Sequence, residues 1–263
     1  MRCAAVIFDW AGTMVDFGSR APVVAMQQAF EAEGVPVSEA EVRAAMGRAK
    51  RDHVAQMLAN TRIEHAWRDR HGAAPSEADI DRIFARIEPL MRVAGAAHAT
   101  LVPGAARVAR ELQSAGVPIG STTGYTRAMM GPIIEAAKSQ GYAPDVIVCA
   151  GETAFGRPSP LMIWKALLDL GAWPASAVVK VDDAPVGIAE GRNAGCFTIG
   201  VAASGNANGL DAIAFAALSD VERAARLAAA RSELLAAGAD LVIDTVADLP
   251  AALRDRGWLW QDV

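Results

Sequence analysis

The sequence predicts an α/β protein with a Rossmann-like parallel sheet, helices on both faces, and a small all-helical cap inserted after the first strand. Two observations support this fold. From Val117 onward, short apolar runs rich in β-formers alternate with helical patterns, as in a parallel sheet covered on both faces. Between the first apolar run and Val117 lie roughly a hundred residues with helical periodicity and no strand pattern. We therefore divide the chain into a core, residues 1–19 and 99–263, and a cap, residues 20–98.

Each expected strand is a short apolar run bounded by Gly, Asp or Ser. The runs are Ala4–Phe8, Val117–Gly120, Val146–Cys149, Val178–Val181, Phe197–Val201 and Leu241–Ile243. The helical patterns between and after them are Tyr125–Ser139, Pro160–Leu170, Pro185–Ala194 and the Ala-rich Asp220–Gly238. Parallel sheets of this kind bind their ligands beyond the carboxyl ends of the strands. The residues that follow each run are therefore the candidates for a functional site.

The cap contains one well-marked helix. Ser76, with Asp79 three residues later, predicts a capping box at its start. Apolar residues then recur at spacings of three and four and form a single stripe, from Ile80 to Met91. This stripe is either the cap's own core or a contact surface for a second copy of the chain.

Composition excludes several classes of protein. A net charge of -5 argues against non-specific nucleic-acid binding, which needs a basic surface. No apolar run approaches the roughly 18 residues of a membrane span. The amino-terminal apolar stretch is short and is ended by Asp9, unlike a signal peptide. Cys3, Cys149 and Cys196 lack metal-ligand spacing, and we expect buried thiols in a cytoplasmic protein.

Polar residues with complementary chemistry follow the expected strands. Asp9 follows the first strand, Ser121-Thr122-Thr123-Gly124 the second, and Asp182-Asp183 the run that begins at Val178. Arg157 lies in a loop between Gly156 and Pro158. Taken alone, Asp9 is as well explained by helix capping. Together, the carboxylates could hold Mg²⁺, the hydroxyls and the cation could hold phosphate oxygens, and one aspartate could attack phosphorus.

These residues resemble the four motifs of the haloacid dehalogenase superfamily: Asp9-x-x-x-Thr13, Thr123, the loop cation Arg157, and Asp183. The helical insertion resembles the cap of that superfamily. Several longer segments resemble the phosphonoacetaldehyde hydrolase family: 9–13, 121–126, 156–158 and the cap segment Met46-Gly47-Arg48-Ala49-Lys50-Arg51-Asp52-His53. The resemblance implies a homodimer with contacts through the cap, a small phosphonate substrate, and a cap lysine that forms a Schiff base with the substrate aldehyde. Lys50 is the matching residue.

The resemblance also implies a substrate pocket and a metal site. Met46, Gly47, Gly124 and Tyr125 match pocket positions, although Tyr125 is equally well explained by packing at a helix start. The Mg²⁺ ligands would be Asp9, the main-chain carbonyl of Ala11, and Asp183. Many relatives carry a further aspartate where this chain has Gly187, so water or Asp182 is left to replace it. Asp182 fits a ligand and a helix cap equally well.

Two departures from the phosphatases of the superfamily bear on the reaction. Those enzymes carry a general acid two residues after the nucleophile, and Ala11 cannot donate a proton to an alkoxide leaving group. Arg157 stands where most members have lysine, and a guanidinium stays charged. Ala11 fits a leaving group that departs from phosphorus as an enamine, and Arg157 can hold phosphonate oxygens with its planar fork.

The amine of Lys50 must be neutral to form an imine, whereas an unperturbed lysine, with a pKa of about 10.4, is protonated at neutral pH. We expect desolvation by Met46 and repulsion from Arg48 and Arg51 to lower this pKa. In a helix, His53 would lie on the same face and could shuttle protons. Without the resemblance, Lys50 would be read as a surface lysine and His53 as structural.

The reaction expected is hydrolysis of phosphonoacetaldehyde to acetaldehyde and phosphate, with Lys50, Asp9, Thr123, Arg157 and His53 as catalytic residues. Two alternatives remain. A haloacid dehalogenase proper would attack carbon without a metal, and Asp183 with the hydroxyls argues against it. A non-catalytic relative that binds a phosphorylated ligand would have no need of a nucleophile.

Overall fold

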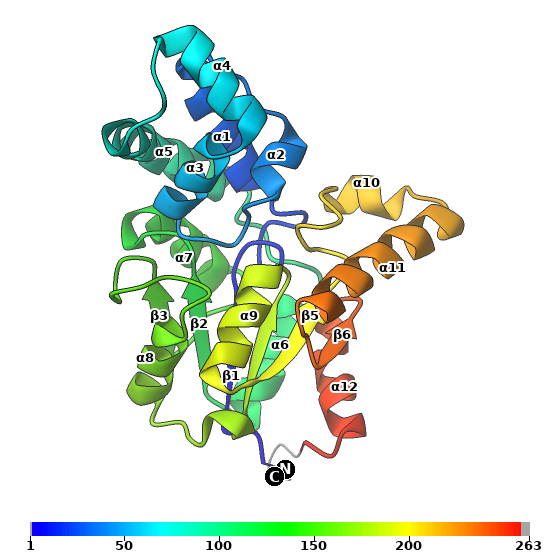
Figure 1. Cartoon of the computed structure of the whole chain (residues 1–263). Helices are drawn as coiled ribbons and strands as arrows, with labels where there is room; N and C mark the ends of the chain where they lie inside the picture. The colour runs from blue at the N-terminus through cyan, green and yellow to red at the C-terminus, as the bar shows by residue number, and fades with distance from the viewer. Residues whose placement is uncertain (1, 259–263) are drawn as a thin grey trace.

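The computed structural model describes residues 2–258 and contains one parallel sheet with a helical cap above it (Figure 1). The six strands of the sheet lie in the order β3-β2-β1-β4-β5-β6, and all five pairings are parallel. Their bounds are β1 Ala5–Phe8, β2 Ile119–Thr123, β3 Val146–Cys149, β4 Val178–Asp182, β5 Phe197–Val201 and β6 Leu241–Ile243. The predicted α/β fold is confirmed.

Helices cover both faces of the sheet. On one face, α8 and α9 pack over Ala5, Ile7 and Val178 in a small apolar cluster. On the other face, the alternate residues Val6 and Phe8 join the main core with α6, α7 and α12. The core helices are α6 Ala105–Ser114, α7 Arg127–Ser139, α8 Leu161–Leu170, α9 Pro185–Ala194, α10 Ala212–Ala216, α11 Asp220–Ala236 and α12 Leu249–Asp255, with short 3₁₀ turns at Ala175–Ala177 and Val246–Asp248.

Five helices and no strand lie between residues 20 and 97, the segment assigned to the cap. They are α1 Arg20–Ala32, α2 Glu39–Arg43, α3 Lys50–Leu58, α4 Thr61–His71 and α5 Glu77–Ala97. The predicted capping box of Ser76 and Asp79 opens α5. Ile80, Ile83, Ile87 and Met91 are buried within this one chain, so the stripe belongs to the cap's own packing.

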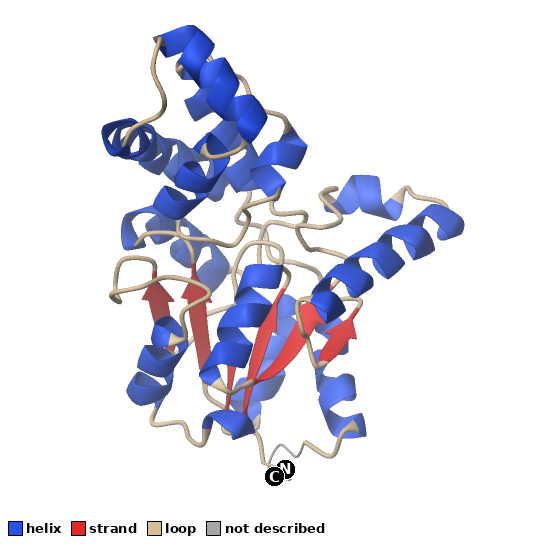
Figure 2. Ribbon diagram, in the orientation of Figure 1, coloured by secondary structure: helices blue, strands red, loops and turns tan. Residues whose placement is uncertain are grey.

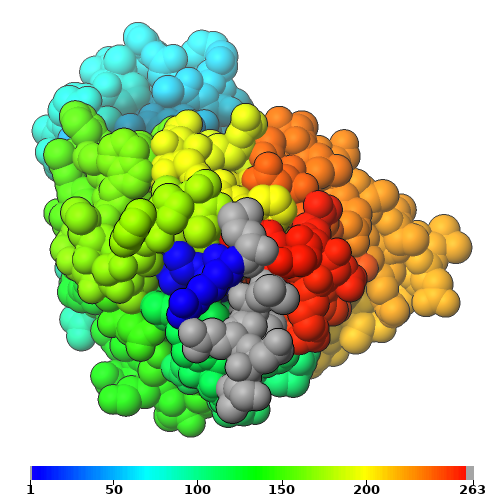
Figure 3. Space-filling model, turned by 90° about the horizontal axis from the view of Figure 1, so that it is seen from below, coloured from blue at the N-terminus to red at the C-terminus, as the bar shows by residue number. Residues whose placement is uncertain are grey.

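The strands point toward the cap, as the arrowheads in Figure 2 show. Seen from below in Figure 3, the first described residues lie on the face away from the cap. The carboxyl ends of β1, β2 and β4 therefore meet the cap, and a site at these ends is covered by it. Within residues 2–258, no helix is long and apolar enough to cross a bilayer.

Strand boundaries differ from the prediction mainly in β2. The sequence predicted Val117–Gly120, whereas the strand runs from Ile119 to Thr123. Its last three residues are hydroxyl-bearing, and all five are buried because β1 and β3 flank the strand. Their hydroxyls find partners inside the protein: Ser121 Oγ accepts from Trp10 Nε1 at 2.8 Å, and Thr122 Oγ1 donates to Glu190.

Candidate active site

An enclosed cavity lies where the strand ends meet the cap. β1 ends one residue before Asp9, β2 ends at Thr123, and β4 ends one residue before Asp183. Because β1 lies between β2 and β4, these three residues come together at one edge of the sheet. The cavity is lined by core residues, by one residue of cap helix α1, and by residues from the segment that opens α3: Asp9, Ala11, Ser19, Pro22, Met46, Gly47, Lys50, Thr123, Gly124, Tyr125, Arg157, Asp183 and Ala184. Every predicted site residue except His53 is among them.

Asp9 and Arg157 form the centre of this site. Arg157 Nη1 lies 2.8 Å from Asp9 Oδ1, and both side chains are almost fully buried. Burial, together with the neighbouring Asp182, raises the pKa of Asp9 to about 6, although Arg157 opposes the shift. The guanidinium is held from behind, since Nη2 donates to Thr122 at both its carbonyl oxygen (2.7 Å) and its Oγ1 (2.9 Å). A fixed cation thus stands beside a buried carboxylate.

Asp183 is held by three donors. Thr13 Oγ1 donates to its Oδ1 at 3.2 Å, while Ser19 Oγ (3.3 Å) and the Asn206 backbone N–H (2.7 Å) donate to Oδ2. Burial and the nearby Asp9 and Asp182 raise the pKa of Asp183 well above its ordinary value.

The carboxylates of Asp9, Asp182 and Asp183 offer oxygens that all lie within 4.8 Å of one another, and all three residues are buried. Buried carboxylates crowded this closely repel one another, which makes the place suited to a cation. All the donor atoms are oxygens, the ligands that Mg²⁺ prefers. The residues present therefore fit a divalent metal ion.

Gly187 explains how Asp182 reaches this cluster. A Cβ atom placed on Gly187 would lie 2.0 Å from the nearer carboxylate oxygen of Asp182, so the Asp182 side chain occupies the space that a residue-187 side chain would need. Asp182 Oδ1 also accepts from the Ala184 backbone N–H at 3.1 Å. Asp182 thus belongs to the acidic cluster and also accepts from the residue that precedes α9, but no side chain caps that helix, so the helix-cap interpretation was wrong.

Sequence reasoning missed two buried charges behind Arg157. Glu190 Oε2 lies 2.9 Å from Arg157 Nε and 3.4 Å from Lys180 Nζ, and Lys180 Nζ lies 3.0 Å from Asp182 Oδ2. All these side chains are at most 1% exposed. A charged residue inside an apolar strand run, Lys180 in Val178–Val181, was the signal available for this network.

Lys50 is buried, as expected for the desolvated lysine that the family resemblance implies, and not at the surface, as its residue type alone would suggest. It is 1% exposed and is the first residue of α3, where the amino-terminal end of the helix disfavours a positive charge. Its Nζ lies 4.9 Å from the centre of the Tyr125 ring. No carboxylate among residues 2–258 lies within ion-pair distance of it.

Desolvation lowers the pKa of Lys50 to about 8, with a further contribution from Arg157, while Asp9 raises it. The predicted direction is confirmed, but the predicted source of repulsion was wrong. Arg51 faces outward and pairs with Glu77 (2.6 Å) and Asp81 (2.7 Å), and Arg48 instead lowers the pKa of His53.

His53 lies beside the cavity but does not line it. Its Nε2 lies 2.8 Å from the Val42 carbonyl oxygen, so Nε2 carries the proton and donates it. Nδ1 is buried and has no hydrogen-bond partner in the described part of the chain. Burial lowers the pKa of the imidazole to about 3, with Lys50 adding to the shift. The ring is therefore neutral and offers one acceptor, which permits only brief acceptance of a proton.

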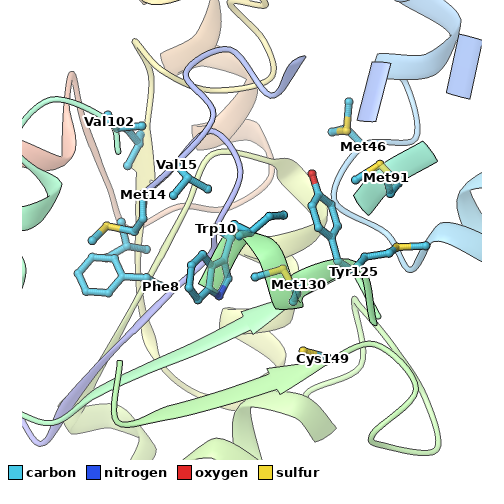
Figure 4. Packing of buried hydrophobic residues seen from close by; sticks show 14 of the residues in the cluster. Phe8, Trp10, Met14, Val15, Met46, Met91, Val102, Tyr125, Met130 and Cys149 are labelled. Carbon is cyan, nitrogen blue, oxygen red and sulfur yellow. The ribbon is translucent and has the colours of Figure 1, made fainter. Parts of the chain in front are cut away.

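Tyr125 and Gly124 form the junction between cap and core. Figure 4 shows Tyr125 between the core cluster around Trp10 and the cap methionines Met46 and Met91. Close contact here requires a glycine, because a Cβ atom on Gly124 would lie 2.3 Å from the Arg48 carbonyl oxygen. The loop after β2 and the loop before α3 therefore touch backbone to backbone, next to Lys50, which lines the same cavity as Asp9.

Comparisons with known proteins agree with this architecture. A haloacid dehalogenase-like hydrolase family model matches residues 3–195. The chain is 49% identical over 251 residues to a phosphonoacetaldehyde hydrolase from Paraburkholderia phytofirmans, covering 95% of this chain and 94% of that protein. The chain belongs to the phosphonoacetaldehyde hydrolase family. A phosphonoacetaldehyde hydrolase from Paraburkholderia xenovorans is 48% identical over the same shares of the two chains.

A solved structure gives the same result for the fold. The crystal structure of a phosphonoacetaldehyde hydrolase-like protein from Oleispira antarctica superposes with a TM-score of 0.94 at 42% identity, covering 97% of this chain and 94% of that one. More distant matches share the fold alone, among them a β-phosphoglucomutase from Clostridium difficile with a TM-score of 0.66 at 17% identity.

Proposed function

We propose that this member of the phosphonoacetaldehyde hydrolase family hydrolyses the carbon–phosphorus bond of phosphonoacetaldehyde, giving acetaldehyde and phosphate. The observation that carries the proposal is Lys50: a buried amine with no carboxylate within ion-pair distance among residues 2–258, facing the same cavity as Asp9 and Arg157. With a pKa of about 8, about a tenth of it is neutral at pH 7. An amine in this state suits attack on an aldehyde, and it would serve no purpose in a simple phosphatase.

The first step joins the Lys50 nitrogen to the aldehyde carbon and releases water, leaving a protonated imine. Arg157 and the hydroxyl of Thr123 hold phosphonate oxygens beside Asp9. A carboxylate oxygen of Asp9 then forms a bond to phosphorus while the carbon–phosphorus bond breaks. The electrons of that bond flow into the imine and give an enamine on Lys50. Because carbon receives them, no acid is needed at Ala11.

The second half of the reaction releases both products. Water attacks phosphorus of the aspartyl phosphate, which frees phosphate and restores Asp9. The enamine takes up a proton at carbon, and water then splits the resulting imine into acetaldehyde and free Lys50. In this proposal, Nδ1 of His53, which has no hydrogen-bond partner among residues 2–258, accepts a proton during these imine steps.

A metal ion held by Asp9, the Ala11 carbonyl and Asp183, which we propose to be Mg²⁺, would neutralise carboxylate charge and let an anionic phosphonate approach Asp9. Asp182 completes the acidic surroundings, since its carboxylate lies within the same cluster.

The test is borohydride trapping. The protein is incubated with phosphonoacetaldehyde and Mg²⁺, reduced with sodium borohydride, and mapped by mass spectrometry. We expect a two-carbon adduct on Lys50. The chain has four lysines, and two of the others serve as internal controls: Lys165 is exposed and paired with Asp169, while Lys180 is buried between carboxylates. Adducts spread equally over all four would argue against a special role for Lys50.

A matched variant separates chemistry from folding. Lys50→Arg keeps the charge and length but cannot form an imine, so turnover should be lost while thermal unfolding changes little. Full acetaldehyde release by Lys50→Arg would remove the Schiff base from the mechanism. Ligand binding without turnover in the wild-type protein would instead support a non-catalytic relative.

The proposal extends to assembly and location. We place the protein in the cytoplasm as a homodimer with contacts through the cap. Cys3, Cys149 and Cys196 are free and buried, as suits a reducing compartment. Val93 on α5 is 73% exposed and offers an apolar contact on the cap. Light scattering of wild type and Val93→Glu tests the assembly, and a monomeric wild type would exclude it.

A further inference from the structure

A single cap arginine reaches three places on the core. Arg43, the last residue of α2, donates from Nη1 to the Gly18 carbonyl oxygen at 2.9 Å and to Asn206 Oδ1 at 3.1 Å. Its Nη2 donates to the Gly209 carbonyl oxygen at 3.1 Å. Within the cap, its Nε bonds Glu39 at 2.7 Å. The rigid fork of one guanidinium thus joins the cap to the β1 loop and to the loop after β5, segment 204–209.

The same loop holds Asp183. The backbone N–H of Asn206 donates to Asp183 Oδ2 at 2.7 Å, the shortest of the three hydrogen bonds to this carboxylate. The side chain of Asn206 faces the other way and bonds Arg43 twice, since Oδ1 accepts from Nη1 and Nδ2 donates to the Arg43 carbonyl oxygen at 3.2 Å. One residue therefore separates the cap from the proposed metal ligand.

The loop is shaped around these contacts. A Cβ atom on Gly205 would lie 2.8 Å from the Asp183 Cβ, and one on Gly209 would lie 3.0 Å from Arg43 Nε. Asn206 and Asp183 are both buried. Segment 204–209 is consequently packed on both sides, against the carboxylate below and the cap arginine above.

We propose that Arg43 and Asn206 are positioning residues through which cap closure and metal binding at Asp183 support each other. With the cap closed, Arg43 fixes Asn206 so that its N–H points at Asp183 Oδ2. With the cap open, the loop loses its bonds from Arg43 and Asp183 loses a fixed donor. By thermodynamic linkage, a metal ion that prefers the fixed carboxylate also favours the closed cap. The inference rests on the proposed metal role of Asp183, not on the carbon–phosphorus chemistry.

Such a link matters because the cavity must open. Its free volume is about 20 Å³, room for about one water molecule, so substrate enters only when the cap moves. A link of this kind makes the metal site most favourable when Lys50 is over Asp9, and least favourable when the site is open to water.

The test measures Mg²⁺ binding directly by isothermal titration calorimetry, without substrate. Partners that orient a metal ligand typically contribute about 10–100-fold in affinity, so we expect Arg43→Ala and Asn206→Ala each to weaken Mg²⁺ binding by about 10-fold. Arg43→Lys keeps the charge but loses the planar fork, so its Mg²⁺ affinity should lie between those of wild type and Arg43→Ala. Glu39→Gln is the matched control, because it removes the cap partner of Arg43 and leaves the core contacts in place.

A second readout reports the cap. Hydrogen exchange of amides in segment 44–50 should slow when Mg²⁺ is added to wild type, and this effect should be lost in Arg43→Ala. The double variant Arg43→Ala/Asn206→Ala should bind Mg²⁺ no more weakly than Arg43→Ala alone. Both substitutions interrupt the same chain of contacts from the cap to Asp183. Unchanged Mg²⁺ affinity in folded Arg43→Lys and Asn206→Ala would overturn the inference. If the variants show these changes in Mg²⁺ binding and hydrogen exchange but the wild-type protein releases no acetaldehyde, only the proposed reaction is contradicted.

Discussion

Replacing Lys50 by methionine is expected to stabilise the protein while abolishing turnover. The folded protein holds Lys50 with a pKa of about 8 instead of 10.5, chiefly because the amine is desolvated. This difference corresponds to about 3 kcal/mol of folding free energy at pH 7. Methionine fills similar space without a charge. Loss of the cation–π contact with the Tyr125 ring reduces this stabilisation by about 1 kcal/mol.

The net gain of about 2 kcal/mol should raise the melting temperature by about 4–8 °C for a chain of this length. Its pH dependence identifies the cause. Because the folded pKa is depressed, the unfolded chain binds more protons between about pH 8 and 10.5, and wild-type stability rises with pH through this window. The charge penalty is therefore complete below about pH 8 and absent above about pH 10.5.

The assay is urea unfolding of wild type and Lys50→Met at pH 7 and pH 10.5. The difference in unfolding free energy between Lys50→Met and wild type should be smaller at pH 10.5 than at pH 7. Lys165→Met is the control, because Lys165 is exposed on α8 and should change stability by no more than about 0.5 kcal/mol. An advantage that is equal at both pH values, or a loss of stability at pH 7, would refute the electrostatic reasoning.

Three further predictions test other parts of the site. The rate of imine formation should fall about tenfold per pH unit below pH 8, as the Lys50 amine is protonated, and stopped-flow absorbance would measure it. Gly124→Ala places a Cβ 2.3 Å from the Arg48 carbonyl oxygen and should lower kcat/KM at least about 10-fold, whereas Gly131→Ala in α7, with open space around it, should not. Glu190→Gln leaves Arg157 and Lys180 with one carboxylate fewer and should cost about 3–5 kcal/mol in thermal unfolding; an unchanged melting temperature would show that the network is not needed.

The sequence predicted the sheet and the residues at its edge because both depend on local pattern. Apolar runs identify buried parallel strands, and in such sheets the residue after each run lies at the ligand edge. Asp9 and the pair Asp182-Asp183 follow from this rule without any knowledge of packing, whereas the choice of Asp183 as the metal ligand came from the family resemblance. The first two residues of the second run, Val117 and Pro118, were placed in a strand because they are apolar, yet the strand begins at Ile119 and continues through hydroxyl residues. Flanking strands, not composition, decided this boundary.

What the sequence left open depends on contacts between distant segments. Lys50 reads as a surface residue from its neighbours, since Arg48, Arg51 and Asp52 are all charged. Only the seating of the cap on Gly124 turns it inward. The roles of Arg43 and Asn206 are likewise invisible in the sequence, because 163 positions separate them along the chain.

The charges around Arg157 explain why Lys50 can remain without a carboxylate partner. Four buried carboxylates surround the site, Asp9, Asp182, Asp183 and Glu190, and two buried cations, Arg157 and Lys180, pair with three of them. Two negative charges are left over, the charge of one divalent cation. A charged Lys50 is therefore not required for neutrality once such an ion is bound. The neutral fraction of Lys50, about a tenth at pH 7, can therefore exist without unbalancing the site, at the cost in stability that Lys50→Met would reveal.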